Sequence, residues 1–333
     1  MMRVIAALAL TCAVACAPAR ATDGDGWRAL QLSSRAVLFE PDDETITRVG
    51  GLAFAGGVEL ASDDPDFGGL SALEITEDGA LYAVTDEGGW FSAQIHLDAE
   101  GRLDGVTGPR FGALRDENGA LFPTKPERDA EGLALLPDGR FAVSFEHSQS
   151  IRLYDLARLG PAGAATAGPR LAGTAALDPN EGPEALAVDA DGALIVGAER
   201  TGGPATLIWR APLDAVEPAA ADYRMPLDFG YGLVALDRLP NGDFIAVQRF
   251  FAPVIGLRIR VLRIEAASLR GPPGQVRAAQ LAELRPPFTI DNFEGAAVTT
   301  APDGGVRLYL LSDDNFNPQQ RTLLLAFDLI GAR

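Results

Sequence analysis

Cysteine is almost absent from this sequence of 333 residues, since only Cys12 and Cys16 occur, both near the N-terminus. Disulfide scaffolds and cysteine-ligated zinc sites are therefore excluded from the rest of the chain. Lysine and histidine are also rare, because Lys125 is the only lysine and His96 and His147 are the only histidines. No Gly-x-Ser-x-Gly motif occurs, so a Ser-His-Asp hydrolase has little support.

Positive charge is scarce as well. The 46 acidic residues outnumber 28 Lys plus Arg and give a formal net charge of −18. Such a charge repels nucleic acid and anionic membrane surfaces, so no nucleic-acid partner is expected. A hydrophobic content of 47% argues against a disordered acidic chain. A globular protein remains.

The first 21 residues resemble an export signal: Arg3 supplies the positive end, residues 4–17 are apolar and uncharged, and Ala-Arg-Ala at 19–21 fits a cleavage site. No apolar run is long enough for a membrane span. We expect a signal peptide over 1–21 and one mature domain over 22–333, in the periplasm or secreted. The alternative is a lipid anchor on Cys16, because residues 13–16 resemble a lipoprotein box with Ala where Leu is usual.

One unit recurs along the chain: an apolar strand, a tight turn, and a second apolar strand. The turns are Asp78-Gly79, Asp138-Gly139, Asp191-Gly192, Asn241-Gly242 and Asp303-Gly304, and their glycines are 60, 53, 50 and 62 residues apart. Such dipeptides predict two-residue hairpin loops in which both residues take positive φ.

This spacing matches the blades of a β-propeller better than the strands of a sandwich, and amphipathic helical patterns are scarce. The predicted fold is all-β, a single β-propeller. Strand-like runs at 35–40 and 49–61 make a sixth blade or close the ring by pairing with the C-terminal strands. Six blades are favoured, and five are the alternative.

The two-residue loops fix which residues lie opposite each other. They pair Glu131 with Glu146, Glu184 with Glu199, Glu294 with Asp313, Ser71 with Asp86, and Val234 with Arg249. Like charges directly opposed destabilise a sheet, so three acid pairs require a cation, a shared proton or guanidinium partners. In a propeller these positions converge, which predicts an acidic rim at one mouth of the central channel.

Carboxylate oxygens are the ligands that Ca²⁺ prefers, so a calcium ion is the expected cofactor. The candidate metal ligands are Asp86, Glu131, Glu146, Glu184, Glu199, Glu294 and Asp313. The same rim is expected to carry their neighbours Arg128, Asp129, His147, Arg200, Asp291, Asn292, Asp314 and Asn315. His96, in an alternating strand, is expected to be structural.

Several motifs, in order, resemble the phytase-like domain family, which is associated with esterase-like activity. They are Asp129-Ala130-Glu131-Gly132, Gly182-Pro183-Glu184-Ala185 with Glu199-Arg200, Asn241-Gly242-Asp243 with Arg249, Asp291-Asn292-Phe293-Glu294-Gly295, and Ser312-Asp313-Asp314-Asn315. The resemblance runs from Phe67 to the C-terminus and implies a secreted propeller that hydrolyses esters or phosphoesters. Gln248 departs from it, because an acid is expected before Arg249.

The function predicted from these features is hydrolysis of an ester, with a phosphoester favoured, at the channel mouth. Glu131, Glu184, His147, Arg200 and Arg249 are the candidate catalytic residues, with the two arginines orienting a small anionic substrate. A monomer is expected. The alternatives are a metal-stiffened binding propeller without turnover and a lactonase-like hydrolase of carboxyl esters.

Overall fold

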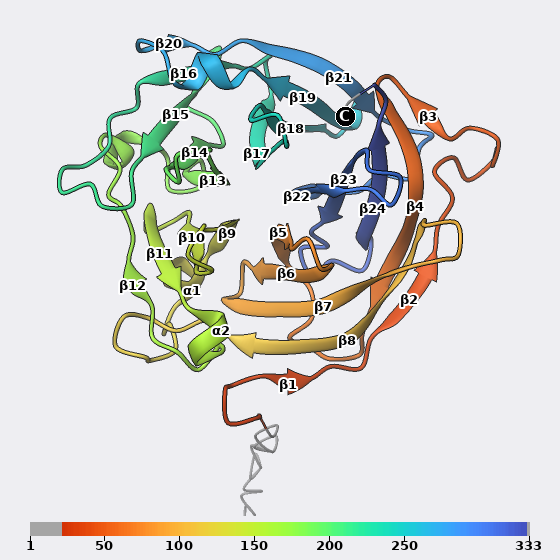
Figure 1. Ribbon diagram of the computed structural model, residues 1–333, viewed down its shortest axis with the longest axis horizontal. Coiled ribbons are helices and arrows are strands. Elements are labelled where there is room, and N and C mark those ends of the chain that lie inside the picture. Colours follow the sequence, from red (N-terminus) through yellow and green to blue (C-terminus); the bar gives the residue numbers. More distant parts are fainter. Residues whose placement is uncertain (1–21, 332–333) are drawn as a thin grey trace, which may run out of the picture.

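The computed structural model describes residues 22–331. Its strands stand around a central axis, with their innermost members facing one another (Figure 1). The predicted all-β propeller is confirmed. The predicted export signal, its cleavage site and the Cys16 anchor lie outside the described residues. Within those residues, no helix has both the length and the apolar character needed to cross a membrane.

The described strands form five four-stranded blades. Blade 1 contains β5 (Leu70–Ile75), β6 (Ala80–Thr85), β7 (Gly89–Leu97) and β8 (Leu103–Ala113). Blade 2 contains β9 (Ala130–Leu135), β10 (Phe141–Phe145), β11 (Ser150–Tyr154) and β12 (Thr166–Ala167). Blade 3 contains β13 (Pro183–Val188), β14 (Leu194–Ala198), β15 (Ala205–Ala211) and β16 (Tyr223–Pro226), with the short β20 (Gly274–Gln275) added beside β16.

Blade 4 contains β17 (Tyr231–Arg238), β18 (Phe244–Ala252), β19 (Gly256–Ile264) and β21 (Ala278–Leu284). Blade 5 contains β22 (Phe293–Thr300), β23 (Val306–Ser312), β24 (Thr322–Leu329) and β4 (Leu52–Ala61). The short strands β1 (Arg28–Ala29), β2 (Ser33–Ala36) and β3 (Arg48–Val49) pair with β8 or β4 on the outside. Between residues 22 and 331, helices are limited to α1 (Lys125–Arg128), α2 (Leu156–Leu159) and two 3₁₀ turns (Thr174–Ala176 and Ala266–Leu269).

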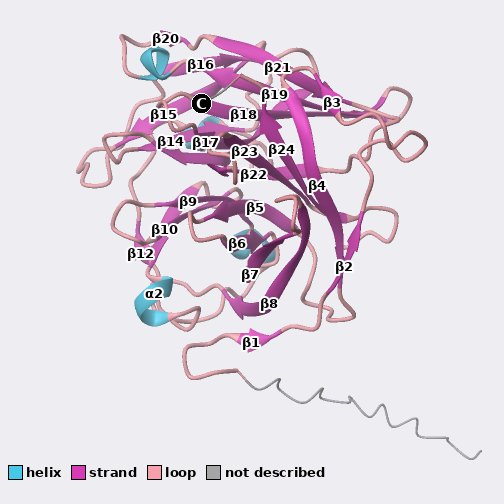
Figure 2. Ribbon diagram, turned by 45° about the vertical axis from the view of Figure 1, so that its right-hand side comes forward, coloured by secondary structure: helices cyan, strands magenta, loops and turns pink. Residues whose placement is uncertain are grey.

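Closure of the ring explains why the favoured sixth blade is not found among the described residues. The run at 49–61 forms β4, which pairs antiparallel with β24 from Leu52 opposite Leu329 to Leu60 opposite Thr322. An N-terminal strand thus completes the last blade, as the five-blade alternative requires. Figure 2 shows β4 running alongside β24.

The turns differ from the prediction in length. In all five hairpins, three loop residues separate the last paired residue of the first strand from the first paired residue of the second. In blade 2, for example, Leu136 N donates to Arg140 O at 2.8 Å, and Gly139 N donates to Leu136 O at 2.9 Å. Only the glycine takes positive φ, +85° at Gly139. A type I turn followed by a left-handed glycine needs one such residue, whereas the predicted two-residue loop needs two.

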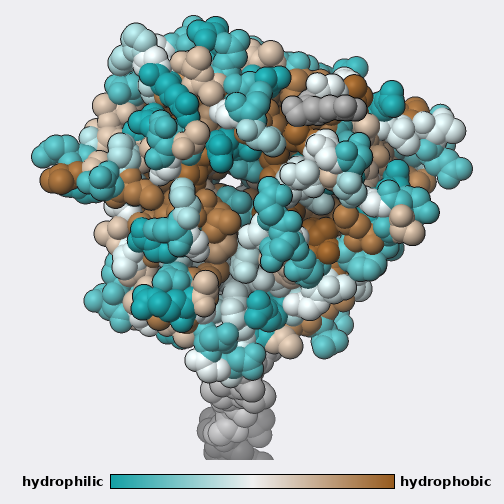
Figure 3. Space-filling model, in the orientation of Figure 1, coloured by the Kyte–Doolittle hydropathy of each residue, from teal (hydrophilic) through white to brown (hydrophobic). Residues whose placement is uncertain are grey.

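The apolar core is divided among the gaps between blades. Five buried clusters occur, and each joins residues of two neighbouring blades. Between blades 1 and 2, for example, the Trp90 ring meets Phe141 and Tyr154 with centroids 5.8 and 5.6 Å apart. The inner strands line the central channel. Figure 3 shows the face viewed in Figure 1, which is hollowed at its centre.

Gly139→Ala should lower the free energy of unfolding by about 1 kcal/mol, because a β-carbon disfavours the left-handed backbone. No atom lies within 4 Å of that β-carbon, so the cost is conformational rather than steric. Urea unfolding measures it. Gly203→Ala is the matched control, since Gly203 also has open space around it but no positive φ. Equal stability of the two variants would contradict the turn assignment.

Candidate functional site

A β-bulge interrupts the inner strand of every blade close to one mouth of the channel. A bulge adds one residue that has no partner across the hairpin, and it re-aims that side chain. The extra residues are Ser71, Glu131, Glu184, Val234 and Glu294. Three of the five are glutamates, so the bulges present acids to the axis.

The predicted hairpin pairings are wrong by two residues. Glu146 N bonds Asp129 O rather than lying opposite Glu131, and Asp313 N bonds Asn292 O, both at 3.0 Å. The three-residue turn shifts the register by one residue, and the bulge shifts it by another. Glu184 with Glu199, Ser71 with Asp86, and Val234 with Arg249 are displaced in the same way.

The side chains nevertheless meet at one mouth, opposite the Asp-Gly turns. We call the following set the acidic ring: Asp86, Asp129, Glu131, Glu146, Glu184, Glu199, Glu294 and Asp313. Carboxylate oxygens of Asp129, Glu131 and Glu146 lie within 4.8 Å of one another, and so do those of Glu146, Glu184 and Glu199. All seven candidate ligands from the sequence belong to the ring, and Asp129 joins them.

Gly132, directly after a bulge, lets two blades approach closely. A β-carbon there would lie 2.1 Å from the backbone oxygen of Glu184, so only glycine fits. The inner strands of blades 2 and 3 are thereby held close enough for their acids to interact.

Arg249 is the internal counter-charge of the ring. It lies within β18 of blade 4, at the position that carries an acid in the other four blades. Its guanidinium bonds Asn292 and Glu294 of blade 5 and reaches Glu199 of blade 3 at 3.4 Å. These carboxylates raise the pKa of Arg249, so it stays charged.

Lys125 is a second counter-charge, which the sequence reasoning did not assign to the site. Its Nζ lies 2.8 Å from Asp86 Oδ2 and 2.6 Å from Asp129 Oδ1, and it therefore bridges blades 1 and 2. Two features of the sequence could have indicated it: it is the only lysine, and Asp129 follows it by four residues.

The other predicted residues lie nearer the edge. Arg200 pairs with Glu199 at 2.9 Å and with Glu181 at 3.3 Å, and Arg128 Nε bonds Glu87 at 2.9 Å. The side chain of His147 is exposed, and no ion pair joins it to a carboxylate within residues 22–331. His96 lies far along β7 and pairs with Asp104 at 2.5 Å.

Asp291, Asp314 and Asn315 organise the loops around the mouth. Asp291 lies 3.4 Å from Arg321. Asp314 accepts hydrogen bonds from Gly69 N at 3.0 Å and Thr322 Oγ1 at 3.0 Å, and Asn315 N donates to Asp313 at 2.6 Å. These residues hold backbone in place and are not part of the acidic ring.

Burial and mutual repulsion raise the pKa values of Asp86, Glu131, Glu146, Glu184, Glu294 and Asp313. Desolvation is the main cause for each of these six acids, followed by neighbouring carboxylates at most of the positions. The pKa of Glu146 rises to about 7 and that of Asp313 to about 9, and those of Glu131 and Glu184 rise well above their ordinary value. Carboxylate oxygens of Glu146 and Glu184 lie within 4.8 Å of each other, so a proton on either group relieves the repulsion between them.

The donor set fits a hard divalent cation. All eight side chains offer oxygen, and only Arg249, Lys125 and Arg200 oppose them among the described residues. Asp86 Oδ1 is buried and has no hydrogen-bond partner, although such an atom is normally satisfied. A cation near this oxygen would satisfy it and relieve the repulsion.

Comparison with known proteins gives one family. A sequence model of the Phytase-like family, described as "Esterase-like activity of phytase", matches residues 65–316. None of the curated proteins compared with the chain matches it.

Solved structures with a similar fold share little sequence. A virginiamycin B lyase from Staphylococcus aureus is 10% identical, with 90% of this chain and 100% of that chain covered and a TM-score of 0.42. A gluconolactonase from Xanthomonas campestris is 14% identical, with 90% and 97% covered and a TM-score of 0.41. A protein of unknown function from Dyadobacter fermentans is 12% identical, with 92% and 96% covered and a TM-score of 0.44. These likenesses carry no argument about chemistry.

In EDTA, the free energy of unfolding should fall as the pH rises from about 5 to about 9. The native pKa values of Glu146 and Asp313 lie above their ordinary values of 4.5 and 3.8, so between these limits the native state binds more protons than the unfolded chain. The stabilisation that these two groups contribute is complete below about pH 4. It is lost as the pH rises through about 7 for Glu146 and about 9 for Asp313, at up to about 1.4 kcal/mol per pH unit for each group.

Urea unfolding at each pH measures this slope. Asp313→Asn should flatten it between about pH 7 and 9, whereas Asp214→Asn, an exposed acid at the opposite end of the molecule, should not. A wild-type stability that stays constant to pH 9 would show that the ring ionises normally.

Proposed function

Because this chain belongs to the Phytase-like family, we propose that the acidic ring is the active site of a hydrolase that cleaves ester bonds. The observation that supports it best is the close approach of the Glu146 and Glu184 carboxylates at the channel mouth, where their oxygens lie within 4.8 Å of each other. The two carboxyls would share a proton there, because burial raises the pKa of Glu146 to about 7. A group with a pKa near 7 can both accept and return a proton at neutral pH, which is what general acid–base catalysis requires.

We further propose that the ring holds a divalent cation, with calcium the best match to an all-oxygen donor set. Asp86, Asp129, Glu131 and Glu146 would hold it on one side of the mouth, and Glu146, Glu184 and Glu199 on the other. When bound, such a cation lowers the pKa of water and offsets charge that builds up on a substrate oxygen.

The chain's own residues divide the remaining work. Glu146, whose pKa is about 7, takes a proton from the attacking water and returns it to the leaving oxygen. Arg249 fixes the positions of Glu199 and Glu294 through ion pairs with both carboxylates. Lys125 does the same for Asp86 and Asp129.

This arrangement favours a carboxyl ester over the phosphoester expected from the sequence. Arg249 and Arg200 are both engaged by carboxylates, so neither guanidinium is available to grip a phosphate without breaking ion pairs. Eight acids around the mouth also repel an anionic substrate. Action after export, in the periplasm or outside the cell, stays part of the proposal and rests on residues 1–21.

Millimolar calcium should raise the melting temperature relative to EDTA, because a ligand of the native state alone stabilises it by mass action. The free energy of unfolding rises by about 2.7 kcal/mol at a free calcium concentration 100 times the Kd. Differential scanning calorimetry measures it, with magnesium as a second cation. Identical curves in calcium and EDTA would remove the cation from the site.

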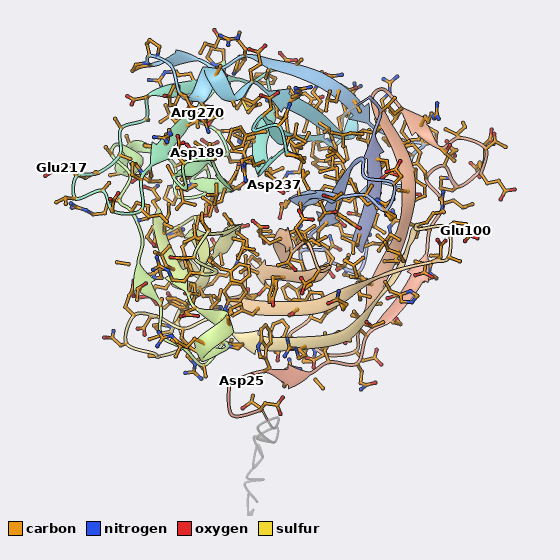
Figure 4. All side chains as sticks on the ribbon, viewed as in Figure 1. Asp25, Glu100, Asp189, Glu217, Asp237 and Arg270 are labelled. Atoms are coloured by element: carbon orange, nitrogen blue, oxygen red, sulfur yellow. The ribbon has the colours of Figure 1, made fainter. Side chains whose placement is uncertain are left out.

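Glu184→Gln should lower ester turnover by about 100-fold or more while the fold is retained, because the amide cannot share the proton with Glu146. A screen of carboxyl esters, lactones and phosphomonoesters supplies the substrate. Glu100→Gln, an exposed change at the outer edge of the molecule (Figure 4), should be silent. Wild-type protein without turnover across the screen would favour a binding propeller instead.

A further inference from the structure

A cleft of about 720 Å³ opens beside the acidic ring, on the mouth side of blade 1. Its apolar lining comes from Phe111, Leu114, Leu121, Phe122 and Phe316, and Asp86 forms part of its wall. Ligand pockets in proteins commonly have this size and this mixture of apolar lining with a few polar groups. The cleft therefore reaches from the ring, through Asp86, into an apolar space.

Two of the lining side chains are costly to leave in water. Phe316 is 44% exposed and Leu121 is 57% exposed, although most large apolar side chains of the described chain are buried. They lie over one cleft together with three buried apolar residues, so the five side chains form one continuous apolar lining.

The backbone that carries Phe316 is strained. Asn315 and Phe316 both have φ of +49°, a conformation that a bulky residue rarely adopts. Asp313 and Asp314 hold it there, accepting hydrogen bonds from Asn315 N at 2.6 Å and Phe316 N at 3.0 Å. Strain of this kind persists where the surroundings impose it, and it is concentrated at functional sites.

The charged side chains of the wall are engaged in ion pairs. Glu87 pairs with Arg128 at 2.9 Å, Asp66 with Arg28 at 2.7 Å, and Asp86 with Lys125 at 2.8 Å. A charged or polyhydroxylated group would lose hydration here without regaining equivalent partners. An uncharged aromatic group would bury its faces against Phe316 and Leu121.

We propose that this cleft binds an uncharged aromatic arm, of one or two rings, of the ester substrate. The substrate class is then an aryl ester whose reacting carbonyl lies at the Asp86 end. The assignment of an ester rests on the proposed function, whereas the affinity for an aromatic group does not.

The binding test uses naphthalene-1-acetamide, an uncharged aromatic amide without an ester bond, titrated into the full chain by calorimetry. Phe316→Asn removes the ring but keeps a residue that tolerates positive φ, so the fold should survive; a melting curve checks this. The affinity of the Phe316→Asn variant for the amide should be about tenfold or more below that of the wild type, and Leu121→Asn should also lower it.

Val216→Asn is the matched control, because Val216 is 81% exposed on a loop at the opposite end of the molecule. It should bind the amide as the wild type does, and so should Glu184→Gln, which lies in the ring and not in the cleft. No binding to the wild type, or equal affinities in all variants, would overturn the proposal.

The kinetic test compares 2-naphthyl acetate with methyl acetate. Phe316→Asn should lower kcat/KM by about tenfold for the naphthyl ester and leave the methyl ester unchanged, since only the first fills the cleft. Equal losses for both esters would overturn the substrate assignment. If the amide binds as expected but no ester is turned over, the hydrolase proposal fails while the aromatic cleft stands.

Discussion

Five inner strands meet around one axis, and the hydrogen-bonding edge that each turns toward the channel has no partner strand. This constraint governs the rest of the structure. An open edge must be satisfied without a further strand. Two half-buried acids do so from neighbouring blades: Leu135 N donates to Glu74 at 2.8 Å, and Val298 N donates to Asp237 at 2.5 Å. Figure 4 shows Asp237 near the centre of the propeller. Burial raises the pKa of Asp237 to about 7, so even these supports carry an electrostatic cost.

The bulges add acids to this crowded axis, and the blades differ in how they compensate. Blade 4 replaces its acid with Arg249, which reaches the carboxylates on both sides of it. Blades 1 and 2 rely on Lys125, held on the short helix α1. Between blades 2 and 3 no cation of the described chain intervenes, although carboxylate oxygens of Glu146 and Glu184 lie within 4.8 Å of each other there. Compensation is therefore least complete at Glu146, where a catalytic proton or a metal ion has the most to contribute.

The sequence predicts the propeller and the acidic mouth because both depend on repeated short patterns. Each Asp-Gly or Asn-Gly turn reports a hairpin, and the acids recur at a fixed distance from the turns. It does not predict the register, because a three-residue loop and a two-residue loop use the same dipeptide. Two of the bulges have a signal in the sequence, because glycine within a strand often marks a bulge and Gly132 and Gly295 directly follow the extra residues. The prediction of regular hairpins did not include them. Lys125 begins the one-turn helix α1 and Phe316 lies on a loop, and in both cases only tertiary contacts decide the position.

The five blades provide their own comparison of what the channel needs. At the bulge position Ser71 and Val234 replace glutamate, and three residues further along, Ala134, Ala187 and Ala297 stand where Glu74 and Asp237 occur in other blades. The blades therefore pack around the channel with neutral residues at these positions as well as with acids. Burying several like charges costs stability unless something compensates them. Because the fold does not require Glu131, Glu184 and Glu294, their presence at one mouth is best explained by the chemistry that their raised pKa values allow.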